Sequence, residues 1–211
     1  AHVQHVRGHP VPTPAERTLC TERGTARRQT DRLRGRIAAK RALVALTGQP
    51  AGSLRVTSDP SGAPVVLGAS AHVSISHRSG RAVAVASYTD RVGIDLEPIA
   101  SRSPAFLADW FHADEREWVG DAPLAHTLVW SAKEAVLKLL GTGLTLHAPN
   151  MRVEQVDART LTVSLHGDVR EHALRLGVGP ICVQWRYDGV DHVVVTASAP
   201  RARSAAQHRA A

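Results

Sequence analysis

Two segments set the architecture of this chain, Val92-Gly93-Ile94-Asp95-Leu96-Glu97 and Trp130-Ser131-Ala132-Lys133-Glu134-Ala135-Val136-Leu137-Lys138. The first alternates β-branched or apolar residues with acids, which predicts a strand. Side chains point alternately to the two faces of a strand, so Asp95 and Glu97 share one face. Two neighbouring carboxylates repel each other unless a cation lies between them. Taken alone, Asp-x-Glu is equally typical of the polar face of an edge strand.

The second segment predicts a helix from about Leu124 to Leu140 with one apolar side. The residues of this apolar stripe are Leu124, Leu128, Ala132, Ala135, Val136 and Leu139. Glu134 and Lys138, four positions apart, share another side. An isolated pair of this kind is usually an ordinary helical ion pair worth about 0.3–0.5 kcal/mol. A third carboxylate together with the strand pair is what Mg²⁺ accepts as oxygen ligands, so we expect the two segments to meet.

These segments, followed by Gly141-Thr142-Gly143-Leu144, resemble the two motifs of 4′-phosphopantetheinyl transferases. The stretch Val73-Ser74-Ile75-Ser76-His77-Arg78-Ser79-Gly80 is similar to the Ser-His segment of the larger, surfactin-synthetase-activating class of that family. The similarity extends from about Arg27 to Pro200. It implies an α+β fold of two pseudo-symmetric lobes, each a helix packed on a small, mainly antiparallel sheet, with the active site in the cleft between them.

The domain organisation that we expect follows from this resemblance and from local pattern. Residues 1–98 would form an N-terminal lobe with an irregular start at 1–15, residues 99–200 a C-terminal lobe, and residues 201–211 a disordered basic tail. A basic helix should end near Leu46, and another helical stretch should contain Phe106 to Trp118. Strands are expected at Leu54–Thr57, Pro64–Leu67, His72–Ile75, Arg81–Ser87, Arg91–Glu97, Met151–Val156, Thr160–Leu165, Ile181–Tyr187 and Val190–Ala197.

The resemblance also implies an activity. The enzyme would transfer the 4′-phosphopantetheine group of coenzyme A to a serine hydroxyl of an acyl or peptidyl carrier protein and release 3′,5′-ADP, in polyketide, fatty-acid or nonribosomal peptide synthesis. Asp95, Glu97 and Glu134 would hold Mg²⁺, and Lys138 would cover phosphate charge. Glu134 is also the expected general base, a role that needs a raised pKa, which burial supplies and a bound metal opposes.

The coenzyme A site is less completely matched. By resemblance, Ser76, His77, Lys133 and Lys138 would contact the coenzyme, and Arg28, Arg32 and Arg36 would lie near its 3′-phosphate. The family usually has a basic residue at the position of Ala63, where this chain has none. Arg78 or an arginine of the first helix is the expected substitute; otherwise coenzyme A binds less tightly.

Composition narrows the choice of partners. The net charge is +7, and only 4% of residues are aromatic, which leaves few rings for stacking single-stranded nucleic acid. The resemblance implies two anionic partners that account for this charge, coenzyme A and an acidic carrier protein, rather than nucleic acid, although a solvated basic helix face would give the same charge. No run of about 18 apolar residues and no secretion signal occurs, so we expect a cytoplasmic protein without a membrane partner. The two-lobed class implies a monomer.

Two other functions stay open at this point. A Mg²⁺-dependent phosphodiesterase could use the same acids and lysine without any carrier protein. A catalytically inactive module that binds coenzyme A or a carrier protein could retain the fold.

Overall fold

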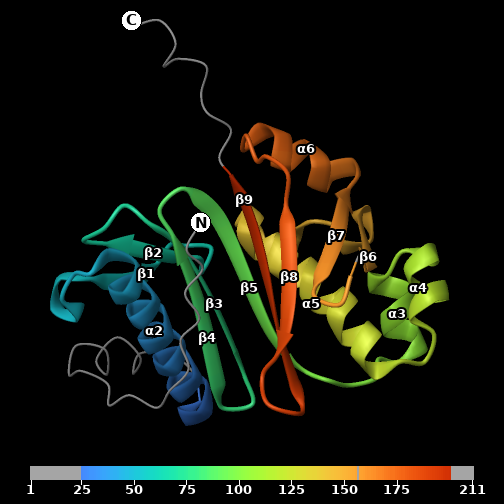
Figure 1. Cartoon of the computed structure of the whole chain (residues 1–211), viewed down its shortest axis with the longest axis horizontal. Coiled ribbons are helices and arrows are strands. Elements are labelled where there is room, and N and C mark those ends of the chain that lie inside the picture. Colours follow the sequence, from blue (N-terminus) through green and yellow to red (C-terminus); the bar gives the residue numbers. More distant parts are fainter. Residues whose placement is uncertain (1–24, 156, 201–211) are drawn as a thin grey trace, which may run out of the picture.

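The computed structural model describes residues 25–155 and 157–200 and shows an α+β protein built from antiparallel sheets (Figure 1). The sheets are a β1–β2 pair, a β3–β4 pair and a five-stranded sheet in the order β5-β9-β8-β7-β6. The strands are β1 (Arg55–Ser58), β2 (Pro64–Leu67), β3 (His72–Arg78), β4 (Arg81–Ser87), β5 (Asp90–Pro98), β6 (Met151–Gln155), β7 (Thr160–Leu165), β8 (Cys182–Tyr187) and β9 (His192–Pro200). All strand pairs are antiparallel, which confirms the predicted fold class.

Helix α2 (Ala26–Thr47) covers the β3–β4 pair. Its buried face carries small residues, which allow the helix to lie close to the strands. That core consists of Ala38, Ala39, Ala42, Leu43, Leu54, Val56, Val73, Ala84 and Ala86. At Gly35 the approach is so close that a Cβ would lie 2.8 Å from the Ile75 side chain. A bulkier residue there would push α2 away from β3, the strand that carries the Ser-His segment.

Helix α5 (Pro123–Leu140) covers β5 and β9 and has almost the predicted bounds. Gly93 explains how α5 can cross β5, because a Cβ on this residue would overlap the Ala135 carbonyl oxygen. The helix ends at Gly141, whose φ of 76° lets its N–H return to the Leu137 and Lys138 carbonyls. The glycine before Asp-x-Glu is therefore required by the packing that brings the two motif segments together.

Strand β5 hydrogen-bonds to β9 along its whole length, with Asp95 opposite Val195 and Glu97 opposite Val193. These ladder bonds join β5, the last strand of the predicted N-terminal lobe, to the sheet of the second half. Its other edge faces β3, where two serine hydroxyls take the place of a ladder. Ser74 Oγ accepts the Ile94 amide at 3.1 Å and Ser76 Oγ accepts the Leu96 amide at 3.2 Å.

The boundary between lobes at residue 98 stays a prediction. The predicted irregular start at 1–15 and the basic tail at 201–211 lie outside the described residues.

The remaining helices are short. The expected helical stretch is two helices, α3 (Pro104–Trp110) and α4 (Ala113–Val119), because His112 caps α4 in a capping box with Glu115. Helix α6 (Gly167–Arg175) was not predicted, since it buries only Val169 and Ala173 and so has no apolar stripe. Single 3₁₀ turns occupy Ala51–Ser53, Gly143–Thr145 and Ala148–Asn150. Among the described residues, no helix combines the length and apolar character that crossing a membrane requires.

Candidate active site

A cavity of about 310 Å³ opens where β3, β5, α3 and α5 meet. Asp95 and Glu97 of β5 line it together with Glu134 and Lys138 of α5, so the structure brings all four of these predicted residues together. The other lining residues are Ser76, His77, Arg78, Leu96, Arg102, Phe106 and Trp130. The strand period and the i, i+4 helix spacing thus place side chains from two distant segments on one pocket.

Lys138 lies at the centre of the polar contacts. Its Nζ is 2.7 Å from Asp95 Oδ1, 3.1 Å from the Ile94 carbonyl oxygen and 3.9 Å from Glu134 Oε2. Asp95 is only 3% exposed, yet its second oxygen, Oδ2, is buried without a hydrogen-bond partner. A buried carboxylate oxygen without a partner is costly, and a bound cation would satisfy it.

Two arginines hold Glu97. Arg102 Nη2 lies 3.2 Å from Glu97 Oε2, and Arg78 Nε lies 3.8 Å from the same oxygen. The Arg102 guanidinium also stands over the Phe106 ring at 5.4 Å from its centroid, while the Arg102 amide donates to His126 Nδ1. Sequence reasoning missed Arg102, because it lies in a loop between β5 and α3 and belongs to no motif; its only signal was a basic residue five positions after Glu97.

The two glutamates of the pocket, Glu97 and Glu134, hold protons more tightly than usual. Burial raises the pKa of Glu134, and the nearby Asp95 and Glu97 charges raise it further against the opposing Lys138. Burial and the Asp95 charge likewise raise the pKa of Glu97 against Arg78 and Arg102. Burial is the main cause of both shifts, and a cation bound beside these carboxyl groups would favour their charged forms.

Two aromatic rings form part of the cavity wall. Phe106 of α3 and Trp130 of α5 line the cavity and contact each other edge-on, with ring centroids 4.9 Å apart. Trp110 packs against Trp130 from behind at 5.3 Å. An apolar wall lowers the local dielectric constant, which strengthens the electrostatic interactions within the pocket.

Ser76 and His77 lie at the end of β3. Ser76 Oγ donates to Asp95 Oδ1 at 3.0 Å, accepts the Leu96 amide and lies 3.3 Å from Lys138 Nζ. The resemblance implied that Ser76 contacts the coenzyme, but here its hydroxyl is engaged by the acid and the lysine. His77 lines the cavity rim, and the atoms packed around its ring lower its pKa, an effect opposed by Asp31 and reinforced by Lys138.

Lys133 does not face the cavity, which corrects the expectation that it lies beside the pyrophosphate. Its side chain is 0% exposed, and its Nζ donates to Glu115 Oε2 at 2.6 Å and to the Trp110 carbonyl at 2.9 Å. Lys133 precedes Glu134 on α5, and successive helical residues point about 100° apart. The two side chains therefore lie on different sides of the helix.

The three arginines expected near the 3′-phosphate have different positions. The Arg36 guanidinium donates to the Val56 and Thr57 carbonyls and to Ser58 Oγ on β1 and does not line the cavity, and its nearness to the 3′-phosphate stays a prediction. Arg32 is exposed and close enough to His77 to help lower the pKa of that ring. The Arg28 side chain lies outside the described part of the structure.

The position that lacks the family's basic residue is remote from the acids. Ala63 lies in the turn between β1 and β2, where its amide donates to Asp59 Oδ1 at 2.9 Å, and it does not line the cavity. Arg78, the proposed substitute, does line it.

The donor set suits Mg²⁺, which binds hard oxygen ligands. Three carboxylates line one cavity, and Asp95 Oδ2 can accept an ion without first releasing a hydrogen bond. Within residues 25–155 and 157–200, no three acidic, histidine or cysteine side chains already stand in a metal-binding arrangement. Lys138 and Arg102 occupy oxygens of Asp95 and Glu97, so these cations would have to give way to an ion.

Comparison with known families agrees with the arrangement of these segments. The model of the 4′-phosphopantetheinyl transferase superfamily matches residues 91–197, a range that contains the three acids and Lys138. The model of the 4′-phosphopantetheinyl transferase N-terminal domain matches residues 15–87, which contain the Ser-His segment.

Individual proteins show the same relation. Enterobactin synthase component D of Salmonella typhimurium is 34% identical over 147 residues, which are 66% of this chain and 59% of that protein. Fatty acid synthase subunit alpha of Saccharomyces cerevisiae is 30% identical over 116 residues, 51% of this chain and 6% of that protein. The chain thus spans less than two thirds of the length of these curated relatives.

Among solved structures, holo-[acyl-carrier-protein] synthase of Helicobacter pylori in complex with coenzyme A matches 51% of this chain and 98% of its own, at 16% identity and a TM-score of 0.43. The family matches rest on the segments that build the cavity. The chain belongs to the 4′-phosphopantetheinyl transferase superfamily.

Proposed function

We propose that this protein transfers the 4′-phosphopantetheine group of coenzyme A to a serine hydroxyl of an acyl or peptidyl carrier protein, with Mg²⁺ as cofactor. The observation that supports this most strongly is the meeting of Asp95, Glu97, Glu134 and Lys138 on one cavity. In the reaction, the serine oxygen forms a bond to the β-phosphorus of coenzyme A. The bond from that phosphorus to the bridging oxygen of the diphosphate breaks, and 3′,5′-ADP leaves.

Asp95, Glu97 and Glu134 are the residues that would hold Mg²⁺. When bound, the ion neutralises diphosphate charge and acts as a Lewis acid. The unpartnered Asp95 oxygen supports this proposal, because a bound cation would satisfy it.

Lys138 would stabilise the negative charge that grows on the phosphate oxygens, because its ammonium group already lies among the acids. Glu134 would accept the proton of the serine hydroxyl and pass it to solvent. Its raised pKa suits a general base at neutral pH, whereas a directly bound ion would lower that pKa. Glu134 therefore has two proposed roles, general base and metal ligand, which require opposite shifts of its pKa.

The rim of the cavity would take the nucleotide end of coenzyme A. His77 and Arg78 line it, and Arg32 of α2 lies near His77, so three side chains that can carry positive charge surround the entrance. Arg78 would replace the basic residue that is missing at Ala63. The aromatic wall of Phe106 and Trp130 would exclude water from the reacting phosphate.

The partner would be an acidic carrier protein of fatty-acid, polyketide or nonribosomal peptide synthesis, in keeping with the net charge of +7. The names of the two relatives, an enterobactin synthase component and a fatty acid synthase subunit, fit such a role. We place the reaction in the cytoplasm, where coenzyme A and carrier proteins meet. We also propose that the protein acts as a monomer, as the resemblance to the two-lobed class implies.

The test is intact-protein mass spectrometry of apo carrier proteins incubated with coenzyme A, Mg²⁺ and the enzyme. The expected result is the mass of one phosphopantetheine group added to the carrier, with no addition when a chelator is present. Release of 3′,5′-ADP without carrier modification would favour a phosphodiesterase instead. Coenzyme A binding without turnover on a broad carrier panel would favour an inactive binding module.

A further inference from the structure

The β3–β4 hairpin carries His77 and Arg78 and, among the strands that the structure describes, is hydrogen-bonded into no larger sheet. The hydroxyls of Ser74 and Ser76 join its β3 strand to β5, as described above. Beyond Ser76 the hairpin continues to its tip, where β3 ends at Arg78 and β4 begins at Arg81. The position of this tip decides where the rim residues stand relative to the acids.

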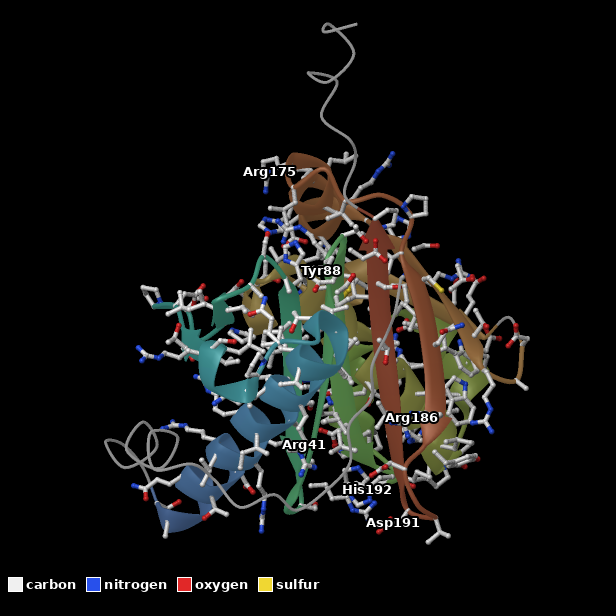
Figure 2. All side chains as sticks on the ribbon, turned by 60° about the vertical axis from the view of Figure 1, so that its left-hand side comes forward. Arg41, Tyr88, Arg175, Arg186, Asp191 and His192 are labelled. Carbon is white, nitrogen blue, oxygen red and sulfur yellow. The ribbon has the colours of Figure 1, made fainter. Side chains whose placement is uncertain are left out.

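Arg81 ties the tip to the other half of the molecule. Its Nη1 donates to the Asp188 carbonyl oxygen at 2.7 Å and lies 3.3 Å from Asp188 Oδ2, while its Nη2 donates to Asp191 Oδ1 at 3.1 Å. These partners are 107 and 110 positions away in the sequence. In Figure 1 the β3–β4 tip and the β8–β9 turn end side by side, and Figure 2 shows Asp191 and His192 at that end of β9.

The β8–β9 turn is shaped to receive this guanidinium. Gly189 has a φ of +75°, which L side chains rarely adopt, and it lies against the arginine, because a Cβ there would be in van der Waals contact with Arg81 Nη1 at 3.4 Å. The turn is closed by the Asp188 amide, which donates to the His192 carbonyl. Asp188 is only 6% exposed, and a buried carboxylate needs a cation beside it.

The same turn is anchored to the strand that carries the acids. The Ile99 amide, just after β5, donates to the Asp191 carbonyl at 2.8 Å, and Pro98 pairs with His192. Arg81 thus connects the tip of one hairpin to a fixed point close to Glu97.

A displacement of Arg81 would directly move the rim residues His77 and Arg78. Arg81 is the ladder partner of Arg78, and Ala82 that of His77. Ser79 and Gly80 between them have φ values of 51° and 75°, which makes a tight two-residue turn with no slack.

We propose that Arg81 is a positioning residue, whose clamp on Asp188 and Asp191 holds the hairpin tip so that His77 and Arg78 face the acids across the cavity. This inference rests on the proposed function, because it concerns how the rim is presented to coenzyme A. Arg81 contacts no substrate in this account and acts only through the tip.

The test compares Arg81→Gln with Arg152→Gln. Arg152 on β6 is a matched control: its side chain is 40% exposed, against 39% for Arg81, and it pairs with two carboxylates, Asp114 at 2.9 Å and Glu154 at 3.1 Å. For Arg81→Gln we expect KM for coenzyme A to rise by about 5- to 20-fold while kcat changes by less than about twofold. Arg152→Gln should leave both parameters near wild type.

Hydrogen exchange of the ligand-free proteins tests the clamp without any assumption about activity. The amides of residues 78–82 should exchange faster in Arg81→Gln and in Asp191→Asn than in wild type. In Arg152→Gln their exchange rates should equal those of wild type. The double variant Arg81→Gln/Asp191→Asn should show less than the sum of the two single effects, because both remove the same contact. This readout also identifies a variant that is merely misfolded, since exchange would then rise throughout the chain.

Unchanged exchange at the tip, or equal KM values for Arg81→Gln and Arg152→Gln, would overturn the proposal. A wild-type protein that neither binds nor uses coenzyme A would refute the proposed function instead, and the exchange result would still decide whether the clamp exists.

Discussion

Two lysines of helix α5 pair with glutamates in opposite surroundings. Lys133 pairs with Glu115 of α4 at 2.6 Å, and both side chains are 0% exposed. Lys138 pairs with Glu134 of its own helix at 3.9 Å, with 26% and 18% of the side chains exposed. The two lysines are five positions apart, so their difference comes from what each side of the helix meets.

Around the first pair the hydrogen bonds are well satisfied. Glu115 accepts from the amides of His112 and Val153 as well as from Lys133, and thereby joins α4, α5 and β6. Around the second pair one acid remains incomplete, because Asp95 Oδ2 has no hydrogen-bond partner. A satisfied buried ion pair indicates a structural role, whereas an unsatisfied one beside a cavity indicates a site that awaits a ligand.

The largest expected effect is on turnover, from Glu134→Gln in the cavity pair. Loss of the carboxylate removes both the proton acceptor and a metal ligand, so kcat for carrier modification should fall by about 10³- to 10⁴-fold. Thermal unfolding should show a folded protein, because burial already disfavours the charged form of Glu134. Near-normal turnover of this variant would show that Glu134 is neither the general base nor a required metal ligand.

The second largest effect is expected on the free energy of unfolding, from removal of the buried Lys133–Glu115 pair. Lys133→Met leaves the Glu115 carboxylate buried without its cation, so the free energy of unfolding should fall by about 3–5 kcal/mol in denaturant titrations. The double variant Lys133→Met/Glu115→Leu should recover part of that loss, since it removes both charges. A Lys133→Met protein of wild-type stability that binds coenzyme A poorly would instead place Lys133 in the coenzyme site.

A smaller effect is expected from two serines, Ser74 and Ser76, that make the same contact with β5 but should differ in their effect on activity. Ser74→Ala and Ser76→Ala each leave one β5 amide without its acceptor, so each should lose about 1–3 kcal/mol of stability. Only Ser76 also touches Asp95 and Lys138, so only Ser76→Ala should lower kcat/KM. Equal kinetic losses in both variants would mean that the contact with β5, rather than the contact with the acid, matters for activity.

The smallest expected effect is the pH dependence of coenzyme A binding. The pKa of His77 is lowered, so the ring is neutral at neutral pH and becomes a cation only below its usual range. Calorimetric affinity for coenzyme A should therefore increase by a few-fold as the pH falls from about 7 to about 5, because the ring becomes a cation below its usual pKa and a cationic ring attracts phosphate. The His77→Ala protein should lack this increase, and an affinity that weakens on acidification in wild type alone would contradict the assignment.

The sequence predicted the cavity acids because their placement depends on local geometry. A strand puts Asp95 and Glu97 on one face, and one helical turn puts Glu134 and Lys138 on one side, whatever the rest of the chain does. The bounds of α5 and most strands followed from the same periodicities. The fold class was predicted from the resemblance of the motifs to the family rather than from these periodicities.

What escaped prediction depends on contacts between distant segments. The burial of Lys133 requires Glu115, 18 positions away, and the partner of β5 is β9, about a hundred positions later. Arg102 reaches Glu97 from an irregular loop. Arg36 was assigned to the coenzyme A site from its position in a basic helix, but its guanidinium donates hydrogen bonds to two carbonyls of β1.

The central claim is that the acids of β5 and α5 together hold a divalent ion on the diphosphate of coenzyme A. A crystal structure of the protein with coenzyme A and Mn²⁺, whose anomalous scattering locates the ion, tests this most directly. The account predicts one anomalous peak within coordination distance of oxygens from Asp95, Glu97 and Glu134 and of a diphosphate oxygen. A coenzyme bound elsewhere on the molecule, or an ion held without these carboxylates, would contradict it.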